Sequence, residues 1–298
     1  MEPLIAPTVL AELLEAPDPA QRPVVLDVRW RLTGPPARPD HDAAHLPGAV
    51  FVDMDTELSD PPGPAGRHPL PSVERLQSAL RRAGVRDDSS VVAHDDAQGV
   101  QAARAWWLLR WAGFPAGRVA VLDGGFRGWV AAGLPTTAEP SRPTAGDVTV
   151  RPGGMPVLDA DDAAALARAG VLLDARAPER YRGEVEPVDP KPGHIPGARN
   201  APATDVLGPD GRWLAPAPLA ARLAAVMGAG AGGAGEVDGE VDGEVAAYCG
   251  SGATAAALVL AAEYAGLRPP QRPIGLYVGS WSNWSADPAR PVAVGAAP

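Results

Sequence analysis

Short apolar runs alternate with longer amphipathic stretches along most of this chain. The apolar runs predict buried β-strands. They lie at 24–29, 90–95, 171–176 and 245–249. The longer stretches carry apolar residues at helical spacing and predict helices. They lie at 72–83, 100–112, 159–169, 216–227 and 254–264. Strands that alternate with helices indicate an α/β fold, in which helices flank both faces of a mostly parallel sheet.

Several motifs occur twice and in the same order, which indicates a tandem duplication. An Asp-x-Arg strand end at 27–29 matches 174–176, and a His-x-Pro-Gly-Ala turn at 45–49 matches 194–198. The remaining pairs are the strands 90–95 and 245–249 and the Trp-containing segments 122–129 and 276–284. The members of each pair lie roughly 150 positions apart, so the halves differ by modest loop insertions. We therefore expect two similar domains.

The length of 298 residues is enough to bury two separate cores. We expect a first domain at 1–137, a linker at 138–156 and a second domain at 157–298. The linker region is rich in Pro, Thr and Gly and shows no periodicity, which is typical of a connecting segment. Residues 228–243 are low in sequence complexity, and we expect a mobile, solvated loop there.

Composition narrows the possible partners. A net charge of -10 and the absence of any basic run argue against a nucleic-acid-binding protein. No apolar run approaches the ~20 residues that span a bilayer, and the start of the chain lacks the pattern of a signal peptide. The single cysteine, Cys249, cannot form an internal disulfide or a cysteine-based metal cluster. We expect a soluble cytoplasmic protein that acts on small molecules or proteins without a metal or cofactor.

Cys249 is the strongest candidate for chemistry. It ends an apolar run and is followed by a glycine-containing turn and an alanine-rich helix. Backbone N–H groups and the helix dipole at such a position favour a thiolate. A buried structural cysteine is the alternative, because free Cys behaves as a small hydrophobe. Gly250 and Gly252 favour the reactive interpretation, since glycines allow the backbone to approach the sulfur closely.

The place of Cys249 in the predicted fold supports the same interpretation. In open parallel sheets, ligands bind at the carboxyl ends of the strands, where Cys249 is expected. The successive N–H groups of 249–254 could converge on the sulfur or on a bound anion. Thiolate attack on a sulfane sulfur, followed by transfer from a persulfide, needs little beyond such a loop and a group that recognises the donor.

The run Cys-Gly-Ser-Gly-Ala-Thr-Ala at 249–255 resembles the active loop of the rhodanese and mercaptopyruvate sulfurtransferase family. With the repeated motifs, the resemblance covers essentially the whole chain. It implies two tandem rhodanese-like domains, of which only the second is catalytic. Asp95 occupies the place of Cys249 in the first half, which is expected to be an inactive copy. The implied activity is transfer of sulfur from a small anionic donor, through a Cys249 persulfide, to cyanide, a thiol or a protein.

The loop also bears on the choice of donor. Cys-Gly-Ser-Gly resembles the loop of mercaptopyruvate enzymes, whereas thiosulfate enzymes tend to carry Cys-Arg-Lys-Gly. Because Gly250 and Ser251 are neutral, we favour 3-mercaptopyruvate, with thiosulfate as the alternative. Ser251 can donate a hydrogen bond to the substrate or the thiolate. The resemblance further implies donor contacts from the loop residues Gly250, Gly252, Ala253 and Thr254.

Residues outside the loop complete the implied site. Arg180 matches the family arginine that binds the donor's anionic group, a role that suits a planar guanidinium. Many mercaptopyruvate enzymes carry a second arginine shortly downstream, about where this chain has Val188. Lys191 or Arg182 are candidates to replace it.

The resemblance also implies a relay of Asp55, His68 and Ser251. An aspartate-oriented histidine could deprotonate the serine, or pass a proton to the departing pyruvate enolate. In the bland alternative, His68 is a solvated or packing residue of a loop.

Two other functions are compatible with a reactive cysteine. A cysteine phosphatase needs an arginine six residues after the cysteine, and Ala255 stands there, so we reject this class. A non-enzymatic persulfide carrier or regulatory module needs only the cysteine. Turnover with a small donor would exclude the carrier.

Overall fold

The computed structural model describes residues 1–228 and 243–298. The predicted loop at 228–243 therefore lies, apart from its two end residues, outside the described residues. The chain divides into two compact units. Unit 1 comprises Met1–Asp60, Leu70–Gly154 and Leu207–Trp213, and unit 2 comprises Pro61–Pro69, Met155–Val206 and Leu214–Pro298. Each unit thus includes one short segment that the chain order would have assigned to the other half.

Unit 1 is built on a parallel sheet in which the strand order is β1-β5-β4-β2-β3. The strands are β1 (Leu4–Ile5), β2 (Val24–Asp27), β3 (Val50–Phe51), β4 (Val91–His94) and β5 (Val119–Leu122). The helices are α1 (Pro7–Leu14), α2 (Arg38–Ala43), α3 (Val73–Arg82), α4 (Ala103–Trp111) and α5 (Gly125–Ala131), with short 3-10 turns at Pro19–Gln21 and Ala116–Arg118. Helix α4 packs on β4 and β5, and α1 contacts α5. Leu10, Val92 and Trp129 belong to one cluster of buried apolar side chains in the core of this unit.

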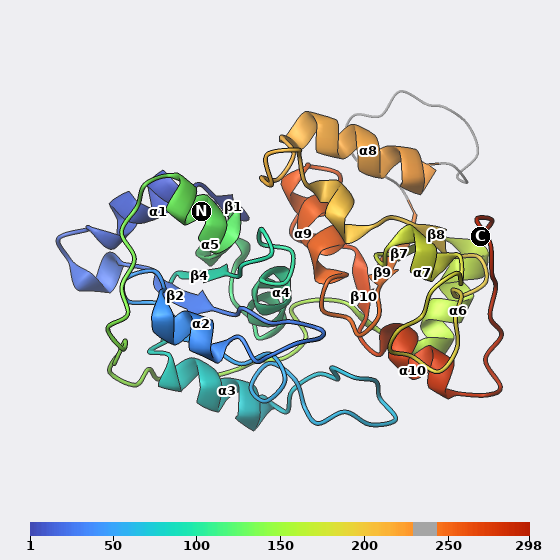
Figure 1. Ribbon diagram of the computed structural model, residues 1–298, viewed down its shortest axis with the longest axis horizontal. Coiled ribbons are helices and arrows are strands. Elements are labelled where there is room, and N and C mark those ends of the chain that lie inside the picture. Colours follow the sequence, from blue (N-terminus) through green and yellow to red (C-terminus); the bar gives the residue numbers. More distant parts are fainter. Residues whose placement is uncertain (229–242) are drawn as a thin grey trace. The chain divides into compact units, whose positions relative to one another are not determined.

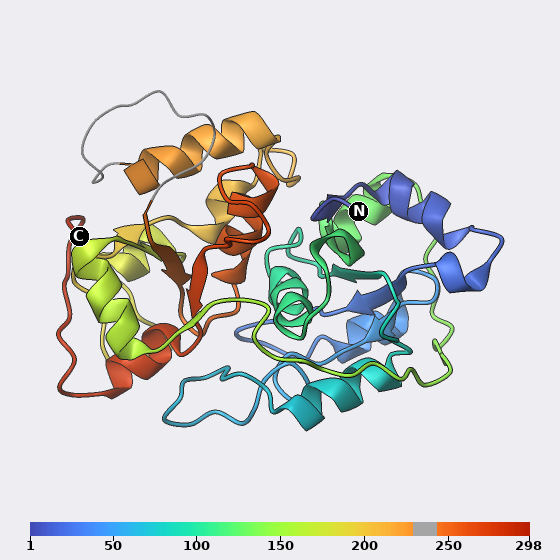
Figure 2. The same cartoon turned by 180° about the vertical axis from the view of Figure 1, so that it is seen from behind.

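Unit 2 repeats this plan in its described part, with a parallel sheet in the order β6-β10-β9-β7-β8. The strands are β6 (Val157–Leu158), β7 (Val171–Asp174), β8 (Arg199–Asn200), β9 (Val245–Tyr248) and β10 (Gly275–Tyr277). The helices are α6 (Ala160–Ala169), α7 (Pro178–Tyr181), α8 (Pro216–Gly228), α9 (Ala256–Tyr264) and α10 (Ser280–Ala286), with a 3-10 turn at Ala203–Val206. Helices α8 and α9 lie side by side, as do α6 and α10 (Figures 1 and 2).

The predicted strands and helices are present, although the strands end one or two residues earlier than predicted and the helix predicted at 100–112 begins at Ala103. Local chemistry explains several of the boundaries. Helix α6 begins after Asp159 because that carboxylate accepts the N–H groups of Asp161 and Asp162 in a capping box. Helix α3 begins after Ser72, whose hydroxyl accepts the N–H of Arg75. The helix predicted at 254–264 begins two residues later than expected, at Ala256. The segment 249–255 is therefore a longer loop than the sequence indicated.

The duplication extends to buried side chains. Asp27 in β2 pairs with Arg29, and Asp174 in β7 pairs with Arg176, each at 2.6 Å between carboxylate oxygen and Nη2. Each arginine also donates from Nη2 to a backbone carbonyl in the turn before the next strand, that of Ala44 or of Gly193. These buried, doubly bonded pairs hold the end of a central strand to the following loop in both units. The shared strand order and shared pairs confirm two tandem α/β domains.

None of the helices within residues 1–228 and 243–298 is long and apolar enough to cross a membrane.

Candidate active site

Cys249 directly follows β9, the strand that lies between β10 and β7 in the sheet of unit 2. Its side chain is buried, with 2% of the residue exposed. The sulfur accepts the backbone N–H of Gly252 at 3.1 Å. The N–H that contacts the sulfur thus comes from the loop itself, three residues along the chain.

The loop is fastened to the start of α10. Trp281 donates its backbone N–H to the carbonyl of Cys249 at 3.0 Å, and Ser282 donates to that of Gly250 at 2.9 Å. The Cys249 N–H in turn donates to the Ser280 hydroxyl at 3.1 Å, and that hydroxyl donates to the Tyr277 carbonyl. Ser280 has a φ of +54°, a conformation that costs a non-glycine residue about 1 to 3 kcal/mol. These hydrogen bonds fix the backbone on both sides of the sulfur.

Gly252 must be a glycine for two reasons. Its φ is +77°, and a Cβ there would lie 2.5 Å from the carbonyl oxygen of Val278. The next two predicted loop residues form the turn into α9, since the carbonyls of Ala253 and Thr254 accept the N–H groups of Ala256 and Ala257. The predicted loop residues are thus together around Cys249.

His68 and Ser251 meet, although 183 positions separate them. Their Nδ1 and Oγ atoms lie 2.7 Å apart, and both side chains are buried. His68 belongs to the segment Pro61–Pro69, which is part of unit 2. The segment is held by the Arg67 N–H on the Ser282 hydroxyl at 2.9 Å, and by the Asn283 amide, which donates to the Pro64 carbonyl. The structure therefore brings two members of the predicted relay together.

Asp55, the third predicted member of the relay, belongs to unit 1. Its carboxylate accepts the indole N–H of Trp30 at 3.0 Å.

Arg180 lies in α7 and faces two buried carboxylates. Its Nη2 lies 2.6 Å from Glu186 Oε1 and 3.1 Å from Asp189 Oδ2. Asp189 uses its other oxygen to accept Nη1 of Arg67 at 2.8 Å. A Cβ built on Gly250 would lie 3.0 Å from Arg67 Nη2 and 3.5 Å from Arg180 Nη1. Two guanidinium groups therefore stand beside the loop of Cys249.

Arg67 is a functional candidate that the sequence analysis missed. The only signal was its place next to His68 in the run Gly-Arg-His-Pro, which by itself indicates no direction. The two residues considered as replacements for the missing arginine are engaged elsewhere. Arg182 pairs with Glu184 at 2.7 Å, and Lys191 Nζ donates to the Asp287 carbonyl at 2.8 Å.

Arg176 supports the acidic side of this cluster. Its burial works against the charged form, but Asp174 next to it outweighs this and raises the pKa of the Arg176 guanidinium above its ordinary value. The guanidinium also lies 3.4 Å from Glu186 and stacks on the Trp281 ring. Glu186 is thus held from two sides, which fixes the carboxylate against which Arg180 rests.

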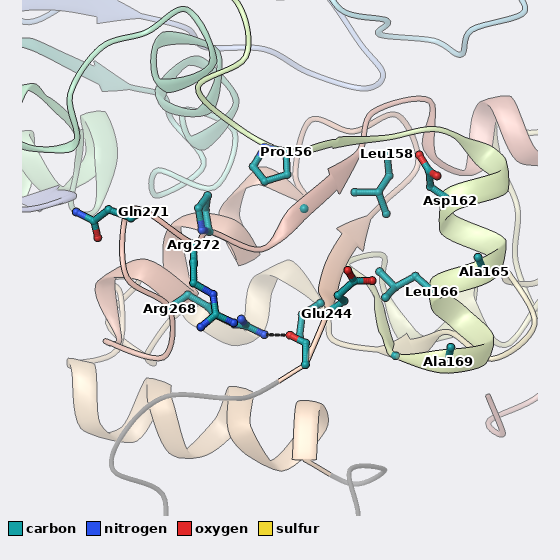
Figure 3. A pocket seen from close by; sticks show the side chains of 15 residues that line it. Pro156, Leu158, Asp162, Ala165, Leu166, Ala169, Glu244, Arg268, Gln271 and Arg272 are labelled. Atoms are coloured by element: carbon teal, nitrogen blue, oxygen red, sulfur yellow. Dashed lines mark hydrogen bonds between the residues drawn. The ribbon is translucent and has the colours of Figure 1, made fainter.

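A cavity of about 750 Å³ in unit 2 lies away from these residues (Figure 3). Its walls include Glu244 and Gly275, which stand at the beginnings of β9 and β10, whereas Cys249 follows the end of β9. Arg268 reaches into it and donates to the Gly243 carbonyl. None of the predicted site residues lines this cavity. Within residues 1–228 and 243–298, no group of three or more His, Cys, Asp or Glu side chains could hold a metal ion.

Comparisons with known proteins agree with this geometry. The family model for the rhodanese-like domain matches residues 6–132 and 159–287. A Pseudomonas aeruginosa protein named "Probable 3-mercaptopyruvate sulfurtransferase" is 45% identical over 298 residues, which cover 98% of each chain. A Mycobacterium tuberculosis protein named "Putative thiosulfate sulfurtransferase SseB" is 44% identical over 99% of this chain and 98% of its own.

Among solved structures, that of SseA from Escherichia coli, described as a 3-mercaptopyruvate sulfotransferase, is similar to this chain. It superimposes with a TM-score of 0.77 at 28% identity, over 95% of this chain and 100% of its own. The family model thus matches both halves of the chain, and the relatives are matched over nearly their full length. The chain belongs to the two-domain rhodanese sulfurtransferase family.

Proposed function

We propose that this protein is a sulfurtransferase in which Cys249 carries the sulfur. In the first step the Cys249 thiolate takes a sulfur atom from a small anionic donor and becomes a persulfide. In the second step the persulfide passes its outer sulfur to cyanide, a thiol or a protein. The observation that carries the proposal is the buried sulfur of Cys249, which accepts the Gly252 N–H beside the Ser251–His68 pair.

The proposed donor is 3-mercaptopyruvate. The thiolate attacks the donor's sulfur, an S–S bond forms, and the donor's C–S bond breaks with its electron pair going to carbon. The cysteine sulfur is oxidised, the donor carbon is reduced, and the pyruvate enolate that leaves takes up a proton. Cyanide then attacks the outer sulfur, thiocyanate leaves, and the Cys249 thiolate is restored.

We propose that Ser251 and His68 handle the protons of the first step. The hydrogen bond between them connects a hydroxyl of the Cys249 loop to an imidazole. Such a pair can accept the proton of the donor's thiol and return it to the enolate. The role of Asp55 in orienting His68 is part of the same proposal.

The inactive first half supports a role for the loop amides. Asp95, 154 positions before Cys249, accepts the N–H groups of Ala97, Gly99, Gln101 and Ala102 at 2.7 to 2.8 Å. By the repeat, the corresponding donors in unit 2 are Ser251, Ala253 and Ala255, whereas the fourth position, Ala256, donates its N–H to the Ala253 carbonyl. We propose that these amides receive the persulfide anion, and that the loop residues from Gly250 to Thr254 also contact the donor.

Donor choice rests on the charge of the loop. Gly250 and Ser251 bring no cation to the sulfur, which favours the monoanionic 3-mercaptopyruvate over the dianionic thiosulfate. Relatives of nearly equal identity carry names that refer to each of these donors. Thiosulfate therefore remains the second candidate.

Place and organisation complete the proposal. A single cysteine that has to act as a reduced thiol suits the cytoplasm, which we propose as the site of action. We also propose a non-catalytic domain at 1–137 and a catalytic domain at 157–298, joined by 138–156.

Steady-state transfer of sulfur to cyanide tests the proposal. We expect kcat/KM to be larger for 3-mercaptopyruvate than for thiosulfate. A preference for thiosulfate would overturn the choice of donor but not the assignment of the protein as a sulfurtransferase. Inactivity of the folded protein with both donors would contradict the enzyme and favour the persulfide carrier.

A further inference from the structure

We propose that Arg67 is the second cation that binds the donor, and that it acts together with Arg180. The inference rests on the proposed function, since it assigns the residue that recognises the carboxylate of 3-mercaptopyruvate. It replaces the arginine that many mercaptopyruvate enzymes carry about where this chain has Val188.

The position of Arg67 beside the sulfur loop is the first argument. Its Nη2 lies 3.0 Å from the point where a Cβ on Gly250 would stand, and Arg180 Nη1 lies 3.5 Å from the same point. Gly250 has no side chain, so both guanidinium groups can approach the residue next to Cys249. A carboxylate near Gly250 would meet cations from two separate segments of unit 2.

The second argument is the bridge between the two arginines. Asp189 accepts Arg67 Nη1 at 2.8 Å on one oxygen and Arg180 Nη2 at 3.1 Å on the other. Its side chain is buried, with 3% exposed, so the bridge is fixed in one geometry. The neighbouring Val188 is 39% exposed. This part of the chain therefore supplies a carboxylate that holds Arg67 in place, where other family members supply an arginine.

The third argument is the hydrogen-bonding capacity that Arg67 keeps. Its Nε is buried and has no hydrogen-bond partner among the described residues. A buried N–H without an acceptor has lost its hydration and gained nothing in return, so a ligand oxygen that accepts it is favoured. A guanidinium that offers Nε and Nη2 matches the two oxygens of a carboxylate. The bridge to Asp189 uses Nη1, which is not part of that edge.

The charges of the cluster are compatible with one further anion. Arg67, Arg176 and Arg180 face three carboxylates, those of Asp174, Glu186 and Asp189. The cluster is neutral as it stands, and a monoanion adds a single negative charge. A dianion would add two, so this arrangement supports the same donor as the neutral loop does.

Binding measured without turnover tests the inference. In the Cys249→Ser background, calorimetric titration with 3-mercaptopyruvate is compared for the parent, Arg67→Gln, Arg67→Lys and Arg182→Gln. Arg182→Gln is the matched control, because this nearby arginine pairs with Glu184 instead. We expect Arg67→Gln to weaken binding about tenfold or more, since a charge-assisted hydrogen bond is lost. Arg67→Lys should recover part of the loss, and Arg182→Gln should stay within about twofold, as expected of a surface pair.

The same substitutions in the enzyme with Cys249 intact separate an effect on donor binding from an effect on the reaction step. We expect Arg67→Gln to raise KM for 3-mercaptopyruvate about tenfold while kcat changes less than about threefold, because the contact is made before and during the reaction alike. Unaltered binding in Arg67→Gln, or a larger loss in Arg182→Gln, would overturn the inference and leave the proposed function standing. A folded Cys249→Ser parent that does not bind 3-mercaptopyruvate at all would overturn both.

Discussion

The loop that follows β4 in unit 1 and the loop that follows β9 in unit 2 are copies with different contents. In unit 1 the loop closes on the carboxylate of Asp95, which accepts four backbone N–H groups and is fully buried. In unit 2 the same position is Cys249, whose sulfur accepts the N–H of Gly252. The first loop is thus filled by a side chain of its own, whose pKa burial raises while the four N–H groups act to lower it. In the proposed mechanism, the second loop receives an anion that forms and disappears during the reaction, the Cys249 persulfide.

The residue that packs against each loop also differs between the units: it is Gly125 in unit 1 and Ser280 in unit 2. In unit 1 the backbone N–H of Phe126 donates to the Asp95 carbonyl, as that of Trp281 donates to the Cys249 carbonyl. The residue before each donor has a left-handed backbone, with φ +56° at Gly125 and +54° at Ser280. A side chain at Gly125 would lie 2.6 Å from the Asp95 carbonyl. Unit 2 accommodates a serine there, and its hydroxyl accepts the Cys249 N–H.

Each unit includes one short segment from the other half of the chain, and the two segments bring different side chains to the two loops. In unit 1, Leu207–Trp213 brings the Trp213 indole to the carbonyl of Gln98, three residues after Asp95. In unit 2, Pro61–Pro69 brings His68 to Ser251, two residues after Cys249. One loop is thus contacted by an aromatic side chain, and the other by His68, which moves a proton in the proposed mechanism.

Replacing the sulfur should produce the largest effect. Cys249→Ser removes the only atom that can become a persulfide, and we expect sulfur transfer to cyanide to fall by about 10³-fold or more. The fold should remain, because serine can accept the same Gly252 N–H. More than trace activity in a variant with unchanged thermal unfolding would refute the role of Cys249.

Removing the proton-handling pair should have the next largest effect. Ser251→Ala leaves the loop backbone in place and deletes the hydroxyl that His68 contacts. We expect kcat with 3-mercaptopyruvate to fall about 10²-fold, the contribution typical of general acid–base groups. His68→Gln should cost as much, and the double variant no more than either, because the two groups act as a unit. Losses that multiply in the double variant would indicate independent roles.

Changing the loop of unit 1 should lower the stability of the protein and leave the rate of sulfur transfer unchanged. Asp95→Asn keeps the shape of the side chain but turns an NH2 group toward N–H donors. We expect the free energy of unfolding in urea to fall by about 2 to 3 kcal/mol, since buried donors lose a charged acceptor. The folded variant should keep the kcat/KM of the parent. A large fall in kcat/KM would show that the first loop takes part in catalysis.

The smallest expected effect concerns the residue before each loop, His94 in unit 1 and Tyr248 in unit 2. Burial lowers the pKa of His94, because the charged imidazolium loses its hydration, although the nearby Asp27 opposes this shift. The unfolded chain therefore binds a proton more readily than the folded one below about pH 6.5, and stability falls as the pH drops through that value. Asp27, by contrast, has a lowered pKa, so its contribution is lost only at more acidic pH.

Comparing His94→Tyr with the parent measures this difference. Between pH 7.5 and 5.5 we expect the parent to lose about 1 kcal/mol more of its free energy of unfolding than the variant does. Equal losses would show that His94 does not titrate differently in the folded protein.

The repeated motifs were enough to predict two α/β domains, because the central strands β2, β4, β7 and β9 each carry an apolar run and the longer helices their own spacing. The two-residue strands could not be predicted in this way, since a strand such as Arg199–Asn200 carries no apolar run. The loop of Cys249 could be predicted in the same way, since its residues are consecutive. The pairing of Arg67 with Asp189 could not. It depends on Pro61–Pro69 being part of unit 2, which no local pattern encodes. The four donors to Asp95 could not be predicted either, because they are backbone N–H groups whose direction is determined only by the folded loop.

The central claim is that the sulfur passes through Cys249, and intact-protein mass spectrometry after reaction with 3-mercaptopyruvate tests it most directly. In the absence of an acceptor, the account predicts a mass gain of one sulfur atom, located on Cys249 by peptide mapping and removed when cyanide is added. Cys249→Ser should show no gain. A protein that turns over donor without gaining sulfur at Cys249, or that gains it elsewhere, would contradict the account.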